Sequence, residues 1–187
     1  MVTPTSDVEE LLRAWREGDG GARDLLIARL QPELASIASA RLRRERDASL
    51  ATGDLVNDTV VRLIRLDGSG VTAPSHFVAL ASRVMRNVLT DHARRKGAGK
   101  REGQRVALDT NIDGPQRLDL LSLDSALIRL RAVDAGLMEL VEMRYFGGMS
   151  VEDCAEVLGL SSTTVKRRWQ VARAWLTDAL THPIDHA

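Results

Sequence analysis

Apolar residues recur at intervals of three and four positions through most of this chain, and this spacing restricts its fold most. In one stretch Leu55, Val56, Val60, Leu63 and Ile64 fall on one helical face. Aromatic residues make up only 3% of the sequence and runs of β-branched residues are few, whereas Leu, Ala, Arg and Glu dominate. The sequence therefore predicts an all-α protein.

The expected helices form two blocks. In the first block, Asp7 is the expected N-cap of one helix, Pro32 kinks or restarts a second, and Pro74 starts the fourth. In the second block, Asp124 or Ser125 opens the first helix. The sequence between the blocks has scattered glycines, mixed charge and no sustained period, which is typical of a linker. We predict two small helical domains joined by a flexible linker, with the boundaries 7–97, 98–123 and 124–182.

The charges balance overall but are unevenly distributed. The chain has 26 Lys plus Arg and 26 Asp plus Glu, so its overall field is weak and does not by itself confer tight non-specific DNA binding. Positive charge gathers in residues 41–46, 94–101 and 166–168. These local clusters, rather than the net charge, indicate where an anionic partner would bind.

Several classes of function are disfavoured. The chain lacks an apolar run of about 20 residues and the pattern of a signal peptide, so we expect a cytoplasmic protein without a membrane partner. Its single cysteine, Cys154, falls where a small apolar core residue belongs, and the four histidines show no ligand spacing with it. There is no glycine-rich phosphate loop and no catalytic Ser/His/Asp or Cys/His set. We expect neither an enzyme nor a metal or other cofactor.

The second block contains the pattern of a helix-turn-helix. Ser150 and Asp153 have capping-box spacing, Gly159 is a natural left-handed helix terminator, and a longer basic helix follows. The second helix of this motif enters the DNA major groove and contacts it through its N-terminal residues. The expected contacts are Ser162, Thr163, Thr164, Lys166, Arg167 and Arg168. The alternative is a solvated basic face on an ordinary helix pair.

The last helix of the first block carries a polar ridge opposite its apolar face. Its members are Arg83, Arg86, Asn87, Asp91, Arg94 and Arg95. Asn87 and Asp91 are four residues apart and therefore face the same way. The ridge is either a nucleic-acid surface or a salt-bridged solvent face, and its residues alone do not decide between the two.

Three motifs in order resemble those of bacterial RNA polymerase sigma factors, specifically the small two-domain extracytoplasmic-function (ECF) group. "DLVNDTVVRLIR" resembles the family's polymerase-clamp-binding helix, and "RNVLTDHARRK" resembles its promoter helix. "LVEMRYFGGMSVEDCAEVLGLSSTTVKRR" matches its helix-turn-helix pattern. The resemblance implies a factor that binds core RNA polymerase and promoter DNA and directs transcription initiation. An anti-sigma factor is a further partner that it suggests.

The resemblance also implies roles for particular residues. Asp54, Leu55, Asn57 and Asp58 would contact the polymerase clamp. The polar ridge would contact the minus-ten region of the promoter, and the loop 67–75 would hold a base flipped from the non-template strand. The helix-turn-helix would bind the minus-thirty-five element as duplex. Residues 77–81 read "FVALA", without the tryptophan usual at this point in the family.

The start of the clamp-binding helix departs from the family pattern. The usual acidic "D-A-E-D" reads Ala51, Thr52, Gly53, Asp54 here, so two acids are missing. Because an anion is favoured at a helix N-terminus, a phosphate on Thr52, or on Ser49 as a second candidate, would restore negative charge. A Ser/Thr kinase would then regulate docking. The alternative is that Thr52 merely caps the helix and that apolar contacts suffice.

Two other functions are compatible with parts of the sequence. A two-domain transcription regulator that binds DNA without polymerase would contain the same helix-turn-helix, usually as a dimer on a palindrome. A helical adaptor that binds only protein would tolerate charge reversal at Lys166 and Arg167. Experiments on DNA binding and on charge reversal can therefore distinguish both alternatives from a sigma factor.

Overall fold

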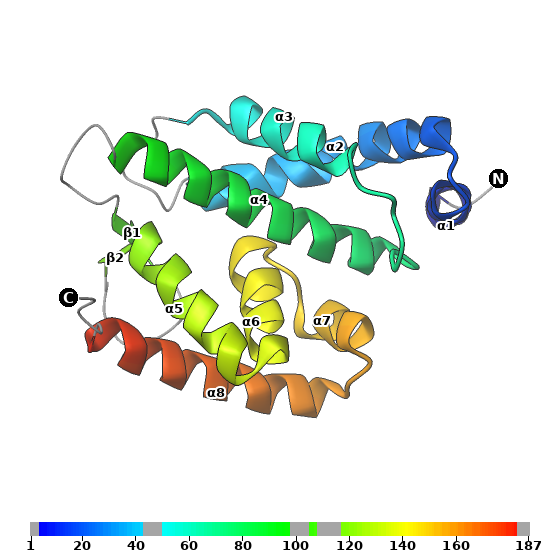
Figure 1. Ribbon diagram of the computed structural model, residues 1–187. Coiled ribbons are helices and arrows are strands. Elements are labelled where there is room, and N and C mark those ends of the chain that lie inside the picture. The colour runs from blue at the N-terminus through cyan, green and yellow to red at the C-terminus, as the bar shows by residue number, and fades with distance from the viewer. Residues whose placement is uncertain (1–3, 43–49, 98–104, 108–116, 183–187) are drawn as a thin grey trace.

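The helices lie in two layers, one from each half of the chain (Figure 1). The structure is a computed structural model and describes residues 4–42, 50–97, 105–107 and 117–182. The first block consists of α1 (Pro4–Arg16), α2 (Gly20–Leu42), α3 (Thr52–Leu63) and α4 (Pro74–Gly97). The second block consists of α5 (Leu120–Val133), α6 (Ala135–Val141), the π-helical turn η1 (Glu142–Phe146), α7 (Val151–Leu158) and α8 (Ser162–Thr181). The predicted all-α fold is confirmed.

The first block is held together by the apolar stripes that the sequence predicts. Leu55 and Leu63 of α3 and Phe77 of α4 are fully buried, and Trp15 of α1 packs edge-on against Phe77 with ring centroids 6.3 Å apart. Pro32 lies inside α2, which continues through it, so the proline does not restart the helix. Helix α1 begins at Pro4, and the predicted N-cap Asp7 therefore lies in its first turn instead.

The second block follows the predicted start and stop signals closely. The Asp134 side chain caps α6 by accepting a hydrogen bond from the Leu137 amide at 3.1 Å. Ser150 and Asp153 form both hydrogen bonds of the capping box at the start of α7. Gly159 ends α7 in the left-handed conformation, with φ of 61°. The helix-turn-helix pattern in the sequence is therefore a helix-turn-helix in the fold.

The segment between the blocks holds the only strands in the described part of the chain. Strand β1 (Arg105–Ala107) pairs antiparallel with β2 (Arg117–Asp119), with Val106 opposite Leu118. Most of the predicted linker, 98–104 and 108–116, lies outside the described residues. Helix α5 begins at Leu120, four residues before the predicted start, and Asp124 lies buried within it. Asp124 is therefore not a helix cap, and its burial must be compensated in another way.

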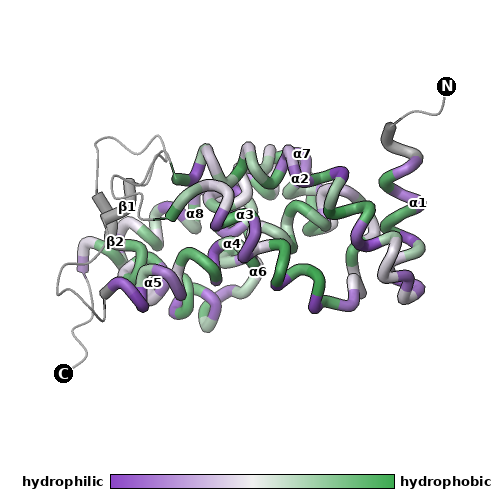
Figure 2. The backbone as a smooth tube through the Cα atoms, turned by 90° about the horizontal axis from the view of Figure 1, so that it is seen from above, coloured by the Kyte–Doolittle hydropathy of each residue, from purple (hydrophilic) through white to green (hydrophobic). Residues whose placement is uncertain are grey.

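The two blocks pack directly against each other along α4. One continuous apolar cluster includes Phe77 and Val88 of the first block and Leu127 and Phe146 of the second. The Ser82 side chain lies so close to Gly147 that a Cβ atom at position 147 would collide with the Ser82 hydroxyl oxygen. In the view from above, hydrophobic and hydrophilic residues alternate along the helices of both layers (Figure 2). No helix in the described ranges is long and apolar enough to cross a membrane.

Candidate nucleic-acid interface

The N-terminal end of α8 presents the exposed basic surface that the helix-turn-helix pattern predicts. Val165 points into the core and is fully buried, whereas Thr163, Lys166 and Arg167 are exposed. The Ser161 side chain caps the helix by accepting a hydrogen bond from the Thr164 amide at 3.2 Å. The surface therefore combines a helix N-terminus, which favours anions, with two exposed cations.

Three other predicted contacts of α8 are less available. The Arg168 guanidinium donates to both carboxylate oxygens of Asp134, at 2.8 and 2.9 Å, and so ties α8 to the start of α6. The hydroxyl of Thr164 lies 2.9 Å from that of Ser161, and Ser162 is half-buried. Because Arg168 is paired with Asp134 in this arrangement, we expect the DNA contacts to come from Thr163, Lys166 and Arg167.

The polar ridge of α4 is divided between solvent and the second block. Asn87 and Arg95 are exposed, and Asp91 of the ridge pairs with Arg62 of α3 at 2.8 Å. Arg86 does not lie on an exposed ridge as predicted, because its side chain is only 11% exposed beneath the second block. It lies one residue before Asn87, on the strip of α4 that the second block covers.

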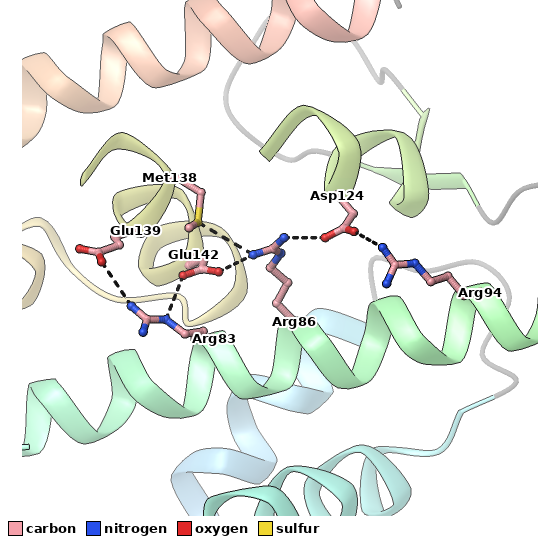
Figure 3. Close-up of polar contacts among 7 residues, drawn as sticks. All are labelled: Arg83, Arg86, Arg94, Asp124, Met138, Glu139 and Glu142. Atoms are coloured by element: carbon pink, nitrogen blue, oxygen red, sulfur yellow. Dashed lines mark hydrogen bonds and ion pairs between the residues drawn. The ribbon is translucent and has the colours of Figure 1, made fainter. Parts of the chain in front are cut away.

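Three arginines of α4 form ion pairs with acids of the second block (Figure 3). Arg86 binds Asp124 and Glu142, each at 2.5 Å, and Arg94 binds Asp124 at 2.9 Å. Arg83 reaches Glu139 at 3.3 Å and Glu142 at 3.4 Å. The side chains of Asp124 and Glu142 are 6% and 3% exposed, so these are buried carboxylates that depend on the arginines for compensation.

The outer face of α3 agrees only in part with the predicted polymerase-binding set. Asp54 and Asn57 are exposed and Asp58 is half-buried, whereas Leu55 is fully buried. Leu55 faces the core of the first block, so a partner cannot contact it here. The remaining three side chains still form a polar surface that a partner could reach.

Thr52 does not cap α3. The N-cap is Ala51, which makes no side-chain cap hydrogen bond, and Thr52 is the half-buried first residue of the helix. The capping role that we considered for Thr52 is therefore wrong. Ser49, the second candidate for phosphorylation, lies outside the described residues.

A groove of about 540 Å³ runs between α2 and α3 beside these residues. Its apolar lining includes Ile27, Val56 and Val60, and Asp24, Gln31 and Asn57 contribute polar groups. The sequence does not predict that α2 contributes to this surface. The spacing of apolar residues indicates which face of α2 is apolar, but not which helix that face packs against.

The loop 67–75 is anchored against α1. The amide of Ser69 donates to Asp67 Oδ1 at 3.0 Å, which lowers the pKa of the Asp67 carboxyl below its ordinary value. Gly68 has φ of 69° and lies against the indole of Trp15. The predicted role of this loop in holding a flipped base stays a prediction.

Cys154 is a core residue, as predicted. Its side chain is fully buried, and desolvation raises the pKa of its thiol to about 11. At neutral pH it is therefore a protonated thiol with low nucleophilicity. Across the ranges that the structure describes, no group of three or more His, Cys, Asp or Glu residues could hold a metal ion.

The sequence matches the family described as "ECF sigma factor" over residues 5–182, which is nearly the whole chain. The protein belongs to the ECF sigma factor family. The matched region runs from α1 to α8 of this sigma factor. It therefore includes α3 and α4, which resemble the clamp-binding and promoter helices, as well as the helix-turn-helix.

Two solved structures are similar to this sigma factor. One is CnrH in complex with the cytosolic domain of CnrY, at 24% identity and a TM-score of 0.41, covering 95% of this chain and 99% of CnrH. The other is the sigma factor RpoE in complex with the anti-sigma factor NepR from Bartonella quintana, at 24% identity and a TM-score of 0.39, covering 86% and 98%. No curated protein matches the sequence significantly.

Proposed function

We propose that this ECF sigma factor binds core RNA polymerase and directs it to promoters, with each block taking one part of the task. The observation that carries the proposal is the exposed basic N-terminus of α8 in a complete helix-turn-helix, within a chain that matches the family over residues 5–182. We assign the minus-thirty-five element to Thr163, Lys166 and Arg167. The minus-ten region is assigned to the polar ridge of α4.

The groove between α2 and α3 is the proposed docking surface for the polymerase clamp. Its apolar lining suits apolar side chains of a partner, and Asp24 within it, with Asp54 and Asp58 nearby on α3, would attract a basic one. Such a partnership would place the protein in the cytoplasm. An anti-sigma factor as a further partner stays a prediction.

Co-purification with core RNA polymerase tests this function against its two alternatives. A sigma factor is expected to co-purify with core enzyme and to shift promoter DNA only in its presence. A polymerase-independent regulator would shift duplex DNA tightly by itself, usually as a dimer. A protein-binding adaptor would show no dependence on Lys166 or Arg167. Failure to bind core enzyme would contradict the proposal.

Charge reversal in α8 should impair promoter use. Arg167→Glu replaces an exposed cation near the N-terminal end of α8 with an anion, and we expect about a 10- to 100-fold loss of transcription from a promoter that depends on the minus-thirty-five element. Run-off transcription with holoenzyme measures the loss. Arg131→Glu makes the same change at an exposed position of α5 outside the motif, and should retain nearly full activity. Equal losses in the two variants would argue against the assignment.

Phosphorylation of Thr52 is a finer part of the proposal. Among the described residues, the N-cap Ala51 supplies no side-chain acceptor to the first amides of α3, and Thr52 lines the groove. A phosphate there would add about −1.5 to −2 charge at a helix N-terminus, where anions are favoured, and would face the basic partner.

The phosphorylation hypothesis predicts conditional binding of core enzyme. Kinase-treated protein should bind core polymerase more tightly than untreated protein, and Thr52→Ala should abolish the gain. Thr72→Ala, which removes a hydroxyl from the loop 67–75, serves as the control and should leave the gain intact. Full-strength binding by the unmodified protein would refute the hypothesis, while leaving the sigma function itself in place.

A further inference from the structure

We propose that the second block inhibits the first within the same molecule. Its carboxylates Asp124, Glu139 and Glu142 hold the α4 arginines that would otherwise bind promoter DNA. The inference rests on the proposed function, since it presumes that α4 meets DNA. We call this set of six residues, Arg83, Arg86, Arg94, Asp124, Glu139 and Glu142, the latch (Figure 3).

The latch acids occupy the arginines in the way that phosphates would. A guanidinium presents paired N–H donors that match carboxylate and phosphate oxygens equally well. Arg86 uses one terminal nitrogen for Glu142 and the other for Asp124. Both ends of its fork are therefore filled, and a phosphate could bind Arg86 only by displacing one of these carboxylates.

Burial makes the competition exclusive. The side chains of Asp124 and Glu142 are 6% and 3% exposed, and Arg86 lies between them. A DNA strand cannot reach Arg86 while α5 and η1 remain on α4. Access therefore requires the two blocks to separate, which would also return the acids to water.

Other contacts help to keep the blocks together. Arg41 of α2 stacks on the ring of Tyr145, with its guanidinium carbon 3.8 Å from the ring centroid, and donates to the Tyr145 hydroxyl. The close approach of Ser82 and Gly147 leaves no space for a side chain at position 147. The two blocks are therefore held together by apolar packing, by the stacking of Arg41 on Tyr145 and by the latch.

One part of the interface opposes closure. A pocket of about 460 Å³ between the blocks is lined by Glu33 from α2 and by Asp153 and Glu156 from α7. Burial and the charge of Asp153 raise the pKa of the Glu33 carboxyl above its ordinary value. Because like charges face each other here, the closed arrangement stores repulsion that separation would relieve.

The occlusion is selective. Lys166 and Arg167 remain exposed at the start of α8 while Arg86 is covered. The closed molecule therefore leaves the proposed duplex-reading surface accessible, whereas in the surface proposed to hold the melted minus-ten region it buries Arg86 and engages the half-exposed Arg83 and Arg94 in ion pairs. Binding of the first block by polymerase would have to shift the molecule toward the open arrangement.

Removing the latch acids tests the proposal on the full chain. Asp124→Asn with Glu142→Gln keeps every arginine, and Glu9→Gln with Glu10→Gln makes the same charge change at exposed positions of α1. Small-angle X-ray scattering measures the radius of gyration, and fluorescence anisotropy measures binding of a labelled, mixed-sequence single-stranded DNA. If the open form is a minor species, the latch variant should be expanded and bind the DNA at least about tenfold more tightly than wild type. The control should match wild type in size and stay within about twofold in affinity.

A second variant guards against misfolding. Ser82→Leu inserts a bulkier side chain opposite Gly147 without changing any charge, and should also expand the molecule and raise DNA affinity. Circular dichroism should show unchanged helix content in both variants. Compact variants with wild-type DNA affinity, in a protein that still binds core polymerase, would overturn the latch and leave the proposed function standing. Expanded variants that bind neither DNA nor core polymerase would overturn the proposed function, and the inhibitory role with it.

Discussion

Arg86→Ala should lower the free energy of unfolding by about 3–5 kcal/mol, because it removes the central cation of a buried ion-pair cluster. Of the cations in the described part of the chain, Asp124 would keep only Arg94, and Glu142 would keep only Arg83 at 3.4 Å. Both acids are almost fully buried, so neither could recover the lost interaction from water without separation of the blocks. Chemical denaturation followed by circular dichroism measures the change.

Arg95→Ala is the matched control on the same helix. Arg95 is exposed, and its only described hydrogen bond is from Nε to the Asp91 carbonyl at 3.3 Å. We expect this substitution to change the free energy of unfolding by no more than about 0.5 kcal/mol. Equal effects of the two substitutions would mean that the acids of the second block do not depend on Arg86 for compensation.

Gly68→Ala should destabilise the first block by about 2–4 kcal/mol. The residue has φ of 69°, where an alanine costs about 1–2 kcal/mol. Its Cβ atom would also lie 2.6 Å from the indole of Trp15, which is 3% exposed and cannot move freely. Overpacking of this kind adds about 1–3 kcal/mol. The shift in the urea midpoint measures the effect.

Gly70→Ala separates the two causes. Gly70 also has positive φ, 83°, but a Cβ atom there meets nothing within 4 Å. We expect it to cost only about 1–2 kcal/mol, the backbone term alone. If Gly70→Ala proves as destabilising as Gly68→Ala, steric overlap with Trp15 does not contribute to the cost of a side chain at position 68.

Local signals in the sequence predicted much of the second block. Ser150, Asp153 and Gly159 cap and end α7 as expected, because capping depends on residues within one turn of the helix. The same signals were less informative in the first block. Thr52 lies at the start of α3 but does not cap it, since the backbone places Ala51 at the capping position.

Contacts between the blocks could not be predicted from periodicity. The pattern around Arg86 shows an arginine beside an apolar stripe, and only the packing of α5 and η1 on α4 reveals that this arginine is buried. One signal was present in the sequence: Glu142 interrupts the apolar run "LMELVEMRYF" at a position that a core residue would normally fill. A buried acid in such a run needs a cation, but sequence spacing does not say which one.

The packing of the blocks also changes how the net charge should be interpreted. An overall field near zero predicts weak DNA binding by the free protein. The structure adds a local cause, because three arginines of α4, the helix proposed to bind the promoter, are already paired with acids of the same chain. The free protein and its polymerase complex should therefore differ in exposed positive surface as well as in partner.

Transcription in vitro with purified core RNA polymerase shows whether this protein directs initiation. Core enzyme alone, this protein alone and the two together are supplied with genomic DNA fragments, and the transcript start sites are mapped. We expect discrete start sites that appear only when both proteins are present. A correctly folded protein that adds no start sites to those of core enzyme would contradict this expectation.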